Sequence, residues 1–507
     1  MEGERTAAGG FFAPRIYSLF LVAFLVLSRW FAAPAYLYYF DSANFALALE
    51  NFNPALHQPQ PPGYPLFVAL TRLIDVFLDD PQQIMLVAGL IGGIAAVMLV
   101  LYLGTLMFNR TAGILAAALL ATDPVFWFGG VTNQVRIFLA LGMAAVCLLG
   151  WRALCAPEHP RRLYLLFAGV GIAAGFRPIE TWLLLPLALW IWHRTGHSYR
   201  RLLLACAALA GTTVPWLAAV LLRSGGPGAF LHLVNEYAVS QFGGTSAMYG
   251  ARSRAAWHMA LEALGWTGLG ALVWIWALPF LRRRAFPAGA RLHAAFLAIA
   301  LVPPLVFSAV VHVGDPDQTL ASVTILSVAG GAVISGLLAS SSPARVYAAA
   351  VLLMLAHTAH FFRAPFHLAE AASYNAVRSV DLLTTGAIRS IADLRGGGPV
   401  TIVHFGSPVS FRQIEYYFPE DHVVALPGSP VQPDPGGATF TYFRHQAVAV
   451  PRGAAGRIGA GSKRLICLPP GNTPGNALPG WRRQGQVFLL DNPPAEGVRL
   501  GQFRLIW

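Results

Sequence analysis

Long apolar segments recur along most of this chain, and they constrain its fold more than any other feature. An α-helix rises 1.5 Å per residue, so about 20 consecutive apolar residues cross the roughly 30 Å hydrocarbon core of a bilayer. The sequence predicts a polytopic α-helical membrane protein with about eleven transmembrane helices. The predicted segments lie near residues 14–33, 84–108, 111–128, 134–154, 162–176, 178–193, 201–222, 258–281, 292–311, 318–339 and 344–362.

Composition and charge exclude several other classes. Hydrophobic residues make up 56% of the 507 residues and charged residues only 11%, which is too apolar for a soluble protein. The formal net charge of +12 would suggest nucleic-acid binding in a soluble chain. Here the arginines fall in short loops between apolar segments, where they orient helices, so no nucleic-acid partner is expected. The four cysteines form no CxxC pair that would indicate a zinc or redox site.

The segment 64–78 is the doubtful one, because it is apolar but short. Its fifteen residues would form a helix of only about 22 Å, and Arg72 and Asp75 interrupt it. If it lies in the membrane interface, the arginine clusters near 110, 152–162 and 282–284 fall on the side of the basic N-terminus, as the positive-inside rule requires. We therefore expect a cytoplasmic N-terminus and one long extracytoplasmic loop over residues 34–83.

The last 145 residues change in character, with more Gly and Pro and fewer long apolar runs. Residues 399–406 and 421–426 read as short buried strands, and residues 411–418 between them read as a helix. This alternation predicts a transmembrane domain over 1–362 and a small extracytoplasmic α/β domain over 363–507. The loops 427–437 and 468–476 are rich in Pro and Gly.

Asp41 is the first charged residue after the first apolar segment. One interpretation is structural, because Asp41 or Ser42 before an apolar run is how an amphipathic helix commonly begins. The other is catalytic, since a carboxylate at a membrane boundary is able to take a proton from an acceptor hydroxyl as a general base. The two roles are compatible.

A proline-rich turn from His57 to Pro65, which includes Tyr64, follows Asp41 in the same loop. Prolines restrict the backbone and a glycine turns the chain, so a purely structural role is possible. A preorganised turn in an exposed loop is also what the wall of an active site needs. On that interpretation His57 and Tyr64 are substrate-binding residues.

Other charged residues are expected at the same membrane face. One interpretation of Arg136 is a helix-end arginine that reaches the lipid headgroups. The other is a phosphate ligand, because the guanidinium fork is suited to that role. Arg252 is a candidate for the same role. The turn 311–320 contains His312, Asp315 and Asp317, more than a connector requires. These three form a weak candidate metal site, and His312 and Asp315 are alternatively substrate-binding.

The chain resembles the GT-C superfamily of polyprenyl-phosphate-dependent glycosyltransferases in several features taken together. These are a first span that ends in aromatics and Asp41, a loop with a His57-Gln-Pro-Gln-Pro-Pro-Gly-Tyr-Pro-Leu turn, the further spans and the C-terminal domain. Residues 41–67 look most like the bacterial members related to protein O-mannosyltransferases. Ser42 departs from the second acid of their Asp-Glu pair, and the spacing from His57 to Pro61-Pro62 is longer than in their pattern.

The resemblance implies an integral-membrane glycosyltransferase of the inner (plasma) membrane. Such an enzyme would move a sugar, with inversion, from a polyprenyl-phosphate donor to a hydroxyl of a glycan, lipid or protein acceptor outside the cytoplasm, with Asp41 as general base and no required metal. Three alternatives stay open. One is a polyprenyl-linked glycan ligase, which would tolerate loss of Asp41. Another is a secondary transporter, which would show charges near the middle of several spans. The third is a non-enzymatic assembly protein whose C-terminal domain binds a partner.

Overall fold

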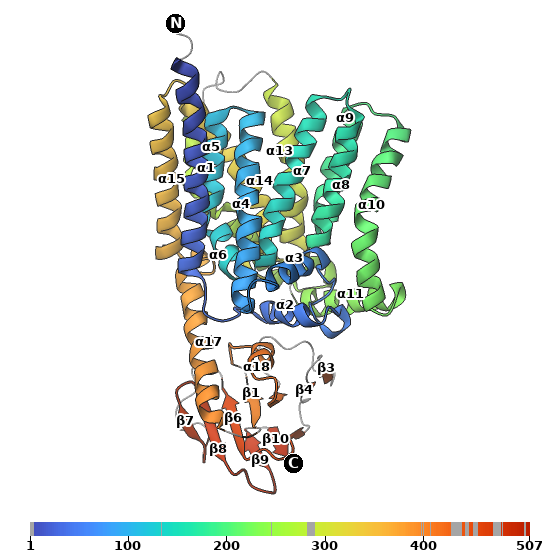
Figure 1. Cartoon of the computed structure of the whole chain (residues 1–507), viewed down its shortest axis with the longest axis vertical. Coiled ribbons are helices and arrows are strands. Elements are labelled where there is room, and N and C mark those ends of the chain that lie inside the picture. Colours follow the sequence, from blue (N-terminus) through green and yellow to red (C-terminus); the bar gives the residue numbers. More distant parts are fainter. Residues whose placement is uncertain are drawn as a thin grey trace.

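The computed structural model describes residues 5–132, 134–244, 246–280, 289–396, 398, 400–405, 407–426, 439–441, 446–449, 455–469, 478, 480–500 and 503–507. The arginines expected to orient the chain at 282–284 and the predicted loop 427–437 lie outside these residues, as does most of the loop 468–476. A bundle of long helices carries a sheet domain at one end, and the N-terminus lies at the opposite end (Figure 1). Termini at opposite ends are what an odd number of crossings produces.

In the part of the chain that the structure describes, seven helices are long and apolar enough to cross a membrane, and a bent pair makes an eighth candidate. The spans are α1 (Arg5–Ala32, apolar from Arg15), α4 (Pro81–Met107), η2 with α7 (Gln134–Arg136 and Ile137–Cys155), α10 (Tyr199–Arg223), α13 with η7 (Ala290–Val306 and Phe307–Val311), η8 with α14 (Pro316–Thr319 and Leu320–Leu337) and α15 (Pro343–Arg363); the bent pair is α5 and α6 (Arg110–Thr122 and Pro124–Thr132).

Three shorter helices account for the remaining predicted segments. They are α8 (Pro160–Phe176), α9 (Glu180–Arg194) and α12 (Ser253–Gly268), which continues through the 3-10 turns η4 (Leu269–Val273) and η5 (Ile275–Phe280). Figure 1 shows α8 and α9 standing beside the longer spans in the same bundle. The prediction of a polytopic α-helical membrane protein is confirmed.

Burial separates the inner from the outer helices. Residues 134–155 and 316–337 are 72% and 67% buried in the bundle, whereas the span of α10 is only 17% buried. The outer helices expose leucines such as Leu19 and Leu203, as helices facing lipid tails do. The inner helices are therefore the ones that can hold polar groups away from lipid.

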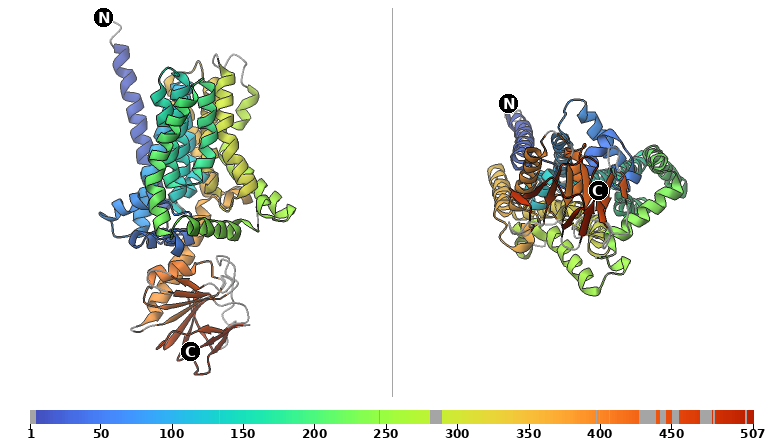
Figure 2. Two further views of the ribbon diagram at one scale, coloured as in Figure 1. Left: turned by 90° about the vertical axis from the view of Figure 1, so that its right-hand side faces the viewer. Right: turned by 90° about the horizontal axis from the view of Figure 1, so that it is seen from below.

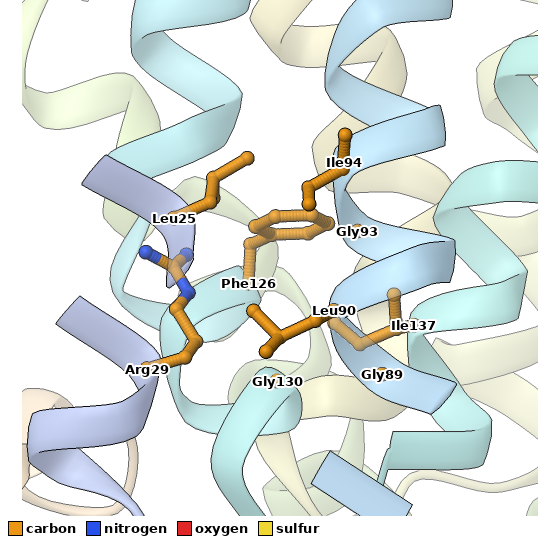
Figure 3. A pocket seen from close by; sticks show the side chains of 9 residues that line it. All are labelled: Leu25, Arg29, Gly89, Leu90, Gly93, Ile94, Phe126, Gly130 and Ile137. Atoms are coloured by element: carbon orange, nitrogen blue, oxygen red, sulfur yellow. The ribbon is translucent and has the colours of Figure 1, made fainter. Parts of the chain in front are cut away.

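The bend between α5 and α6 is 51°, and polar groups compensate for the interrupted helix. Asp123 accepts hydrogen bonds from the backbone amides of Val125 and Phe126, at 2.9 and 3.3 Å. Arg29 of α1 donates to the carbonyl of Ala121, at 2.7 Å, and so satisfies a carbonyl at the end of α5. Figure 3 shows Arg29 and Phe126 around a cavity of about 10 Å³, which is too small for a substrate.

Three further helices lie across the end of the bundle next to the sheet domain (Figures 1 and 2). They are α2 (Phe40–Glu50), α3 (Pro65–Asp75) and α11 (Pro227–Phe242). Arg72 of α3 donates to the carbonyl of Ala48 near the end of α2, at 2.8 Å, and so fixes the two helices together. The interpretation of residues 64–78 as a helix that does not cross the membrane agrees with this arrangement.

The C-terminal region contains two sheets. A seven-stranded sheet has the order β3-β4-β2-β1-β6-β8-β7, and a three-stranded sheet has the order β5-β10-β9. In chain order the elements are α16 (His367–Glu370), α17 (Tyr374–Arg395), β1 (Thr401–His404), α18 (Phe411–Tyr417), β2 (His422–Ala425), β3 (Thr439–Thr441), β4 (Gln446–Ala449), β5 (Ala455–Arg457), β6 (Arg464–Leu468), β7 (Arg482–Gln484), β8 (Val487–Asp491), β9 (Val498–Leu500) and β10 (Phe503–Ile506).

Side chains alternate along β1, and so they pack on opposite faces of the seven-stranded sheet. Ile402 lies opposite Val423 of β2 and Ile466 of β6 in parallel register, and all three join the core formed with α17 and α18. The next residue, Val403, points to the other face and packs with Leu505 of the smaller sheet. The strand-helix-strand prediction is confirmed for β1, α18 and β2.

Candidate active site

Arg136 is the centre of a charged cluster at the end of the bundle that carries α2 and α3. Its guanidinium contacts Asp315 at 2.7 Å and Asp317 at a shorter distance, and lies 3.8 Å from the carboxylate of Asp41. The side chains of Arg136 and Asp317 are 7% and 0% exposed, whereas those of Asp41 and Asp315 are 25% and 32% exposed. Three carboxylates thus share one buried cation, and two of them reach solvent.

Local sequence features bring these groups together. Gly129 of α6 allows the turn at 315–319 to approach closely, because a Cβ at that position would lie 2.8 Å from the Cβ of Asp317. Ser42 donates to the carbonyl of Thr132, at 3.3 Å, and so holds the start of α2 against the end of α6. A glycine and a serine therefore place Asp41 and Asp317 on either side of Arg136.

Asp41 does not cap its helix, contrary to one interpretation of the sequence. The residue that precedes α2 is Tyr39, which makes no side-chain capping bond, and Asp41 is the second residue of the helix. A carboxylate in the first turn still faces the positive end of the helix dipole. A quarter of its side chain is exposed to solvent.

Two further interpretations of this region are wrong. Arg136 does not reach toward the headgroups, because its guanidinium is buried among carboxylates. His312, Asp315 and Asp317 do not converge. Both aspartates face Arg136, whereas the ring of His312 packs at a tilt against Phe242, with ring centroids 4.5 Å apart. Among the described residues no group of three His, Cys, Asp or Glu side chains is arranged to hold a metal ion.

The His57 turn is tightly built. Asn53 and Gln58 form a small antiparallel bridge, with hydrogen bonds of 2.6 and 3.0 Å, and His57 lies between them in the left-handed region at φ 54°. A non-glycine residue in this region is strained, so the surrounding bonds hold it there. Its ring packs edge-on against Tyr237 of α11, with centroids 5.8 Å apart.

Tyr64 and Tyr237 join the turn to the charged cluster. Tyr64 precedes α3 in a left-handed conformation at φ 48°, and the guanidinium of Arg177 lies 5.6 Å from the centre of its ring. Burial, with a smaller effect of Asp41, raises the pKa of Tyr237 well above its usual value. The pKa of Tyr64 is also raised by burial, against the effect of Arg177. Both phenols therefore stay protonated and lie within the electrostatic reach of Asp41.

The two histidines of this region give a prediction for pH dependence. Burial, with a second effect from Arg412 for His57 and from Arg136 for His312, lowers the pKa of each to about 4. In the unfolded chain they bind protons near pH 6.5. Their contribution to stability is therefore present above pH 6.5 and is lost as the pH falls toward 4.

We expect the thermal midpoint of the wild type in detergent to fall more steeply between pH 7 and pH 5 than that of His57→Gln/His312→Gln. Scanning calorimetry or tryptophan fluorescence at both pH values measures the difference. Parallel pH curves for the two proteins would contradict the assigned protonation states.

Arg252 lies apart from the Arg136 cluster. It precedes α12 and is exposed, and with Arg254, His258 and Glu262 it lines a cavity of about 440 Å³. Val313 also lines this cavity and adjoins His312 in sequence. The structure therefore places Arg252 beside the 311–319 turn and leaves its guanidinium accessible, unlike that of Arg136.

Sequence reasoning missed several groups near the site. Asp317 was interpretable only as part of a metal site. It lies in the 3-10 turn η8, Asp315 precedes that turn, and both carboxylates contact Arg136. Tyr237 carried no motif that would single it out. Glu180 and Arg177 were recognisable as charges at the edge of a span, and Glu180 is now seen to be fully buried with no hydrogen-bond partner among the described residues.

Known proteins resemble this chain in part of its sequence and in its fold. Residues 59–222 match the family described as dolichyl-phosphate-mannose-protein mannosyltransferase. The fold is similar to that of ArnT from Cupriavidus metallidurans bound to undecaprenyl phosphate, at 14% identity and a TM-score of 0.59, covering 94% of this chain and 97% of that one. The apo state of the same protein gives 14% identity, a TM-score of 0.58, and 95% and 98% coverage. A comparison with curated protein sequences finds no match.

Fold and site together define a multi-pass membrane protein whose polar groups gather at one end of the bundle, beside an extramembrane domain. The family match and the shared fold confirm the resemblance inferred from the sequence. In residues 59–222 and in its fold, the chain resembles the GT-C superfamily of polyprenyl-phosphate-dependent glycosyltransferases.

Proposed function

We propose that this protein transfers a sugar from a polyprenyl-phosphate donor to an acceptor hydroxyl on the extracytoplasmic face, with inversion, and that Asp41 is the general base. The observation that carries the proposal is the position of Asp41, a partly exposed carboxylate held at the end of the bundle by a buried arginine. A lipid-linked donor keeps its prenyl chain in the bilayer and its phosphate at this level. Asp41 would take the proton of the acceptor oxygen as that oxygen attacks the anomeric carbon and the phosphate leaves.

The arginine that meets the donor phosphate is, on this proposal, Arg252 with its neighbour Arg254. Both are exposed and line one cavity, so a phosphate can approach them without displacing a carboxylate. Arg136 is instead assigned to positioning Asp41, because three carboxylates already surround it. Charge on the leaving phosphate is then matched by two guanidinium groups, and we propose that no metal ion is required.

We also propose an orientation with the N-terminus in the cytoplasm and with the site and sheet domain outside the cytoplasm, in the inner (plasma) membrane. Arginines at the far end of the bundle support it through the positive-inside rule, such as Arg110, Arg161 and Arg200 in the first turns of α5, α8 and α10. Membrane lipid, the donor and a glycan, lipid or protein acceptor are the expected partners.

The proposed function is tested with the purified protein in sealed liposomes that contain a polyprenyl-phosphate sugar and a candidate acceptor. Formation of a glycosylated acceptor, unaffected by a chelator, is the expected result. Movement of labelled donor or sugar across the bilayer without a transfer product would overturn the proposal and favour a transporter.

Replacing Arg252 and Arg254 together by Met is expected to raise the KM for the donor about tenfold or more, because each charge-assisted hydrogen bond contributes about 1.5–3 kcal/mol. The turnover number at saturating donor should change less. Steady-state kinetics with a short-chain donor measures both quantities.

The matched control is Arg194→Met/Arg200→Met, which removes two exposed arginines near the loop between α9 and α10 at the opposite end of the bundle (Figure 1). Its donor KM should equal that of the wild type. Equal KM values for both double variants would remove Arg252 and Arg254 from the donor site.

A further inference from the structure

Helix α18 of the sheet domain is bonded directly to the loop that follows the first span. Gln413 donates its side-chain amide to the carbonyl of Leu37, at 2.5 Å, and the hydroxyl of Tyr417 accepts from the amide of Leu37, at 2.9 Å. Both polar backbone groups of one loop residue are therefore satisfied by side chains more than 370 positions away.

Arg412 makes a second connection, farther along the same loop. Its guanidinium donates to the carbonyls of Leu56 and His57, at 2.8 and 3.2 Å. The side chain is fully buried and lies 3.6 Å from Glu415, which is 2% exposed. The loop thus supplies two acceptors to this buried guanidinium, and a shift of the loop would remove those bonds from a buried charge.

Apolar contacts accompany these bonds on α2 and just before it. Phe40, the residue before Asp41, packs against Phe411 with ring centroids 5.6 Å apart. Tyr36 packs edge-on against Tyr417 at 5.1 Å, and Ala43 and Ala46 of α2 lie in one cluster with the same tyrosine. The contacts of α18 thus fall on both sides of Asp41 and at the backbone of His57.

We propose that α18 is the positioning element of the active-site loop, with Arg412, Gln413 and Tyr417 as positioning residues that hold Asp41 and the His57 turn in their working geometry. The inference rests on the proposed function for its catalytic consequence. The sheet domain would then be required for turnover although it lies outside the membrane bundle and contributes no group to the reaction. A displacement of about 1 Å in a positioned group can lower a rate about 10²-fold.

The test compares Arg412→Met/Glu415→Met with the wild type in the full chain. Removing both partners avoids leaving a buried charge unpaired, so the domain should stay folded. We expect hydrogen-deuterium exchange in residues 35–60 to rise at least tenfold, the turnover number to fall at least tenfold, and the donor KM to change less than threefold. A role confined to the folding of the domain would instead raise exchange in β1 and β6 and leave the loop unchanged.

Two further variants complete the design. Arg395→Met/Asp421→Asn disrupts another ion pair of the same domain, at 2.9 Å. The charged groups of this pair contact no described residue of the first loop. This variant should therefore have the same loop exchange and the same turnover number as the wild type. Tyr417→Phe keeps the ring and removes only the acceptor of the Leu37 amide, so exchange at that amide should rise even if the double variant does not fold.

The exchange measurement does not depend on activity, which separates the two proposals. Unchanged loop exchange in both Arg412→Met/Glu415→Met and Tyr417→Phe overturns the positioning role of α18. Increased loop exchange in a protein whose wild type transfers no sugar supports the positioning role and overturns the proposed function.

Discussion

Asp41→Asn is expected to lower the turnover number for sugar transfer about 10²- to 10⁴-fold, the usual contribution of a general base. The amide has nearly the same size but cannot act as a base for the proton of the acceptor hydroxyl. Asp315 and Asp317 still neutralise Arg136 in this variant, so the fold should be kept. Transfer from a polyprenyl-phosphate donor in liposomes measures the change. The donor KM should stay within about threefold of the wild type.

Asp315→Asn is the matched control. Asp315 is also a partly exposed carboxylate, 32% exposed, and it also contacts Arg136, so the same kind of change alters the same cluster. It should lower turnover less than about tenfold, because on our proposal it accepts no proton from the acceptor. Near-normal turnover of Asp41→Asn would reject Asp41 as the base and favour the glycan-ligase alternative.

Arg136→Met is expected to destabilise the protein by about 3–5 kcal/mol, as is usual when one partner of a buried ion pair is removed. Asp317 is 0% exposed and would be left as a buried carboxylate close to Asp315, without a cation. The thermal midpoint in detergent measures the loss. Turnover should fall as well, because the same guanidinium holds Asp41.

Arg136→Met/Asp317→Asn separates the cause of that loss. The amide removes the buried negative charge, so the double variant should recover a large part of the lost stability without recovering turnover. A double variant that is no more stable than Arg136→Met would show that packing, and not the unpaired carboxylate, accounts for the effect.

Much of the architecture was predictable because hydropathy is a local property. A segment long enough to span the bilayer is recognised without knowledge of its neighbours. Each of the eleven predicted segments coincides with helix, and among the described residues seven helices, or eight with the bent pair, are long and apolar enough to cross a membrane. The strands β1 and β2 were also recognisable, since they are short buried runs with turn residues on both sides. The strands β3 to β10 are mostly shorter or partly exposed, and their identity depends on pairing with distant segments.

The roles of individual charges were harder to predict. Arg136 was recognised as an arginine near a span, but its partners Asp315 and Asp317 are 179 and 181 residues away. A phosphate ligand and an arginine neutralised by carboxylates look alike in sequence. Only the packing of α6 against the 315–319 turn distinguishes them, because it buries Asp317 beside the guanidinium.

The sequence by itself determined that the chain crosses a membrane many times, that its first loop carries a carboxylate and a rigid turn, and that an α/β region follows the spans. These properties depend on apolar length, on proline and on periodicity, which act over a few residues. The tertiary structure alone decided that Asp41 shares Arg136 with two aspartates and that α18 supports the loop from the other end of the chain. Such contacts depend on how helices pack, and packing joins residues whose separation in sequence carries no local signal.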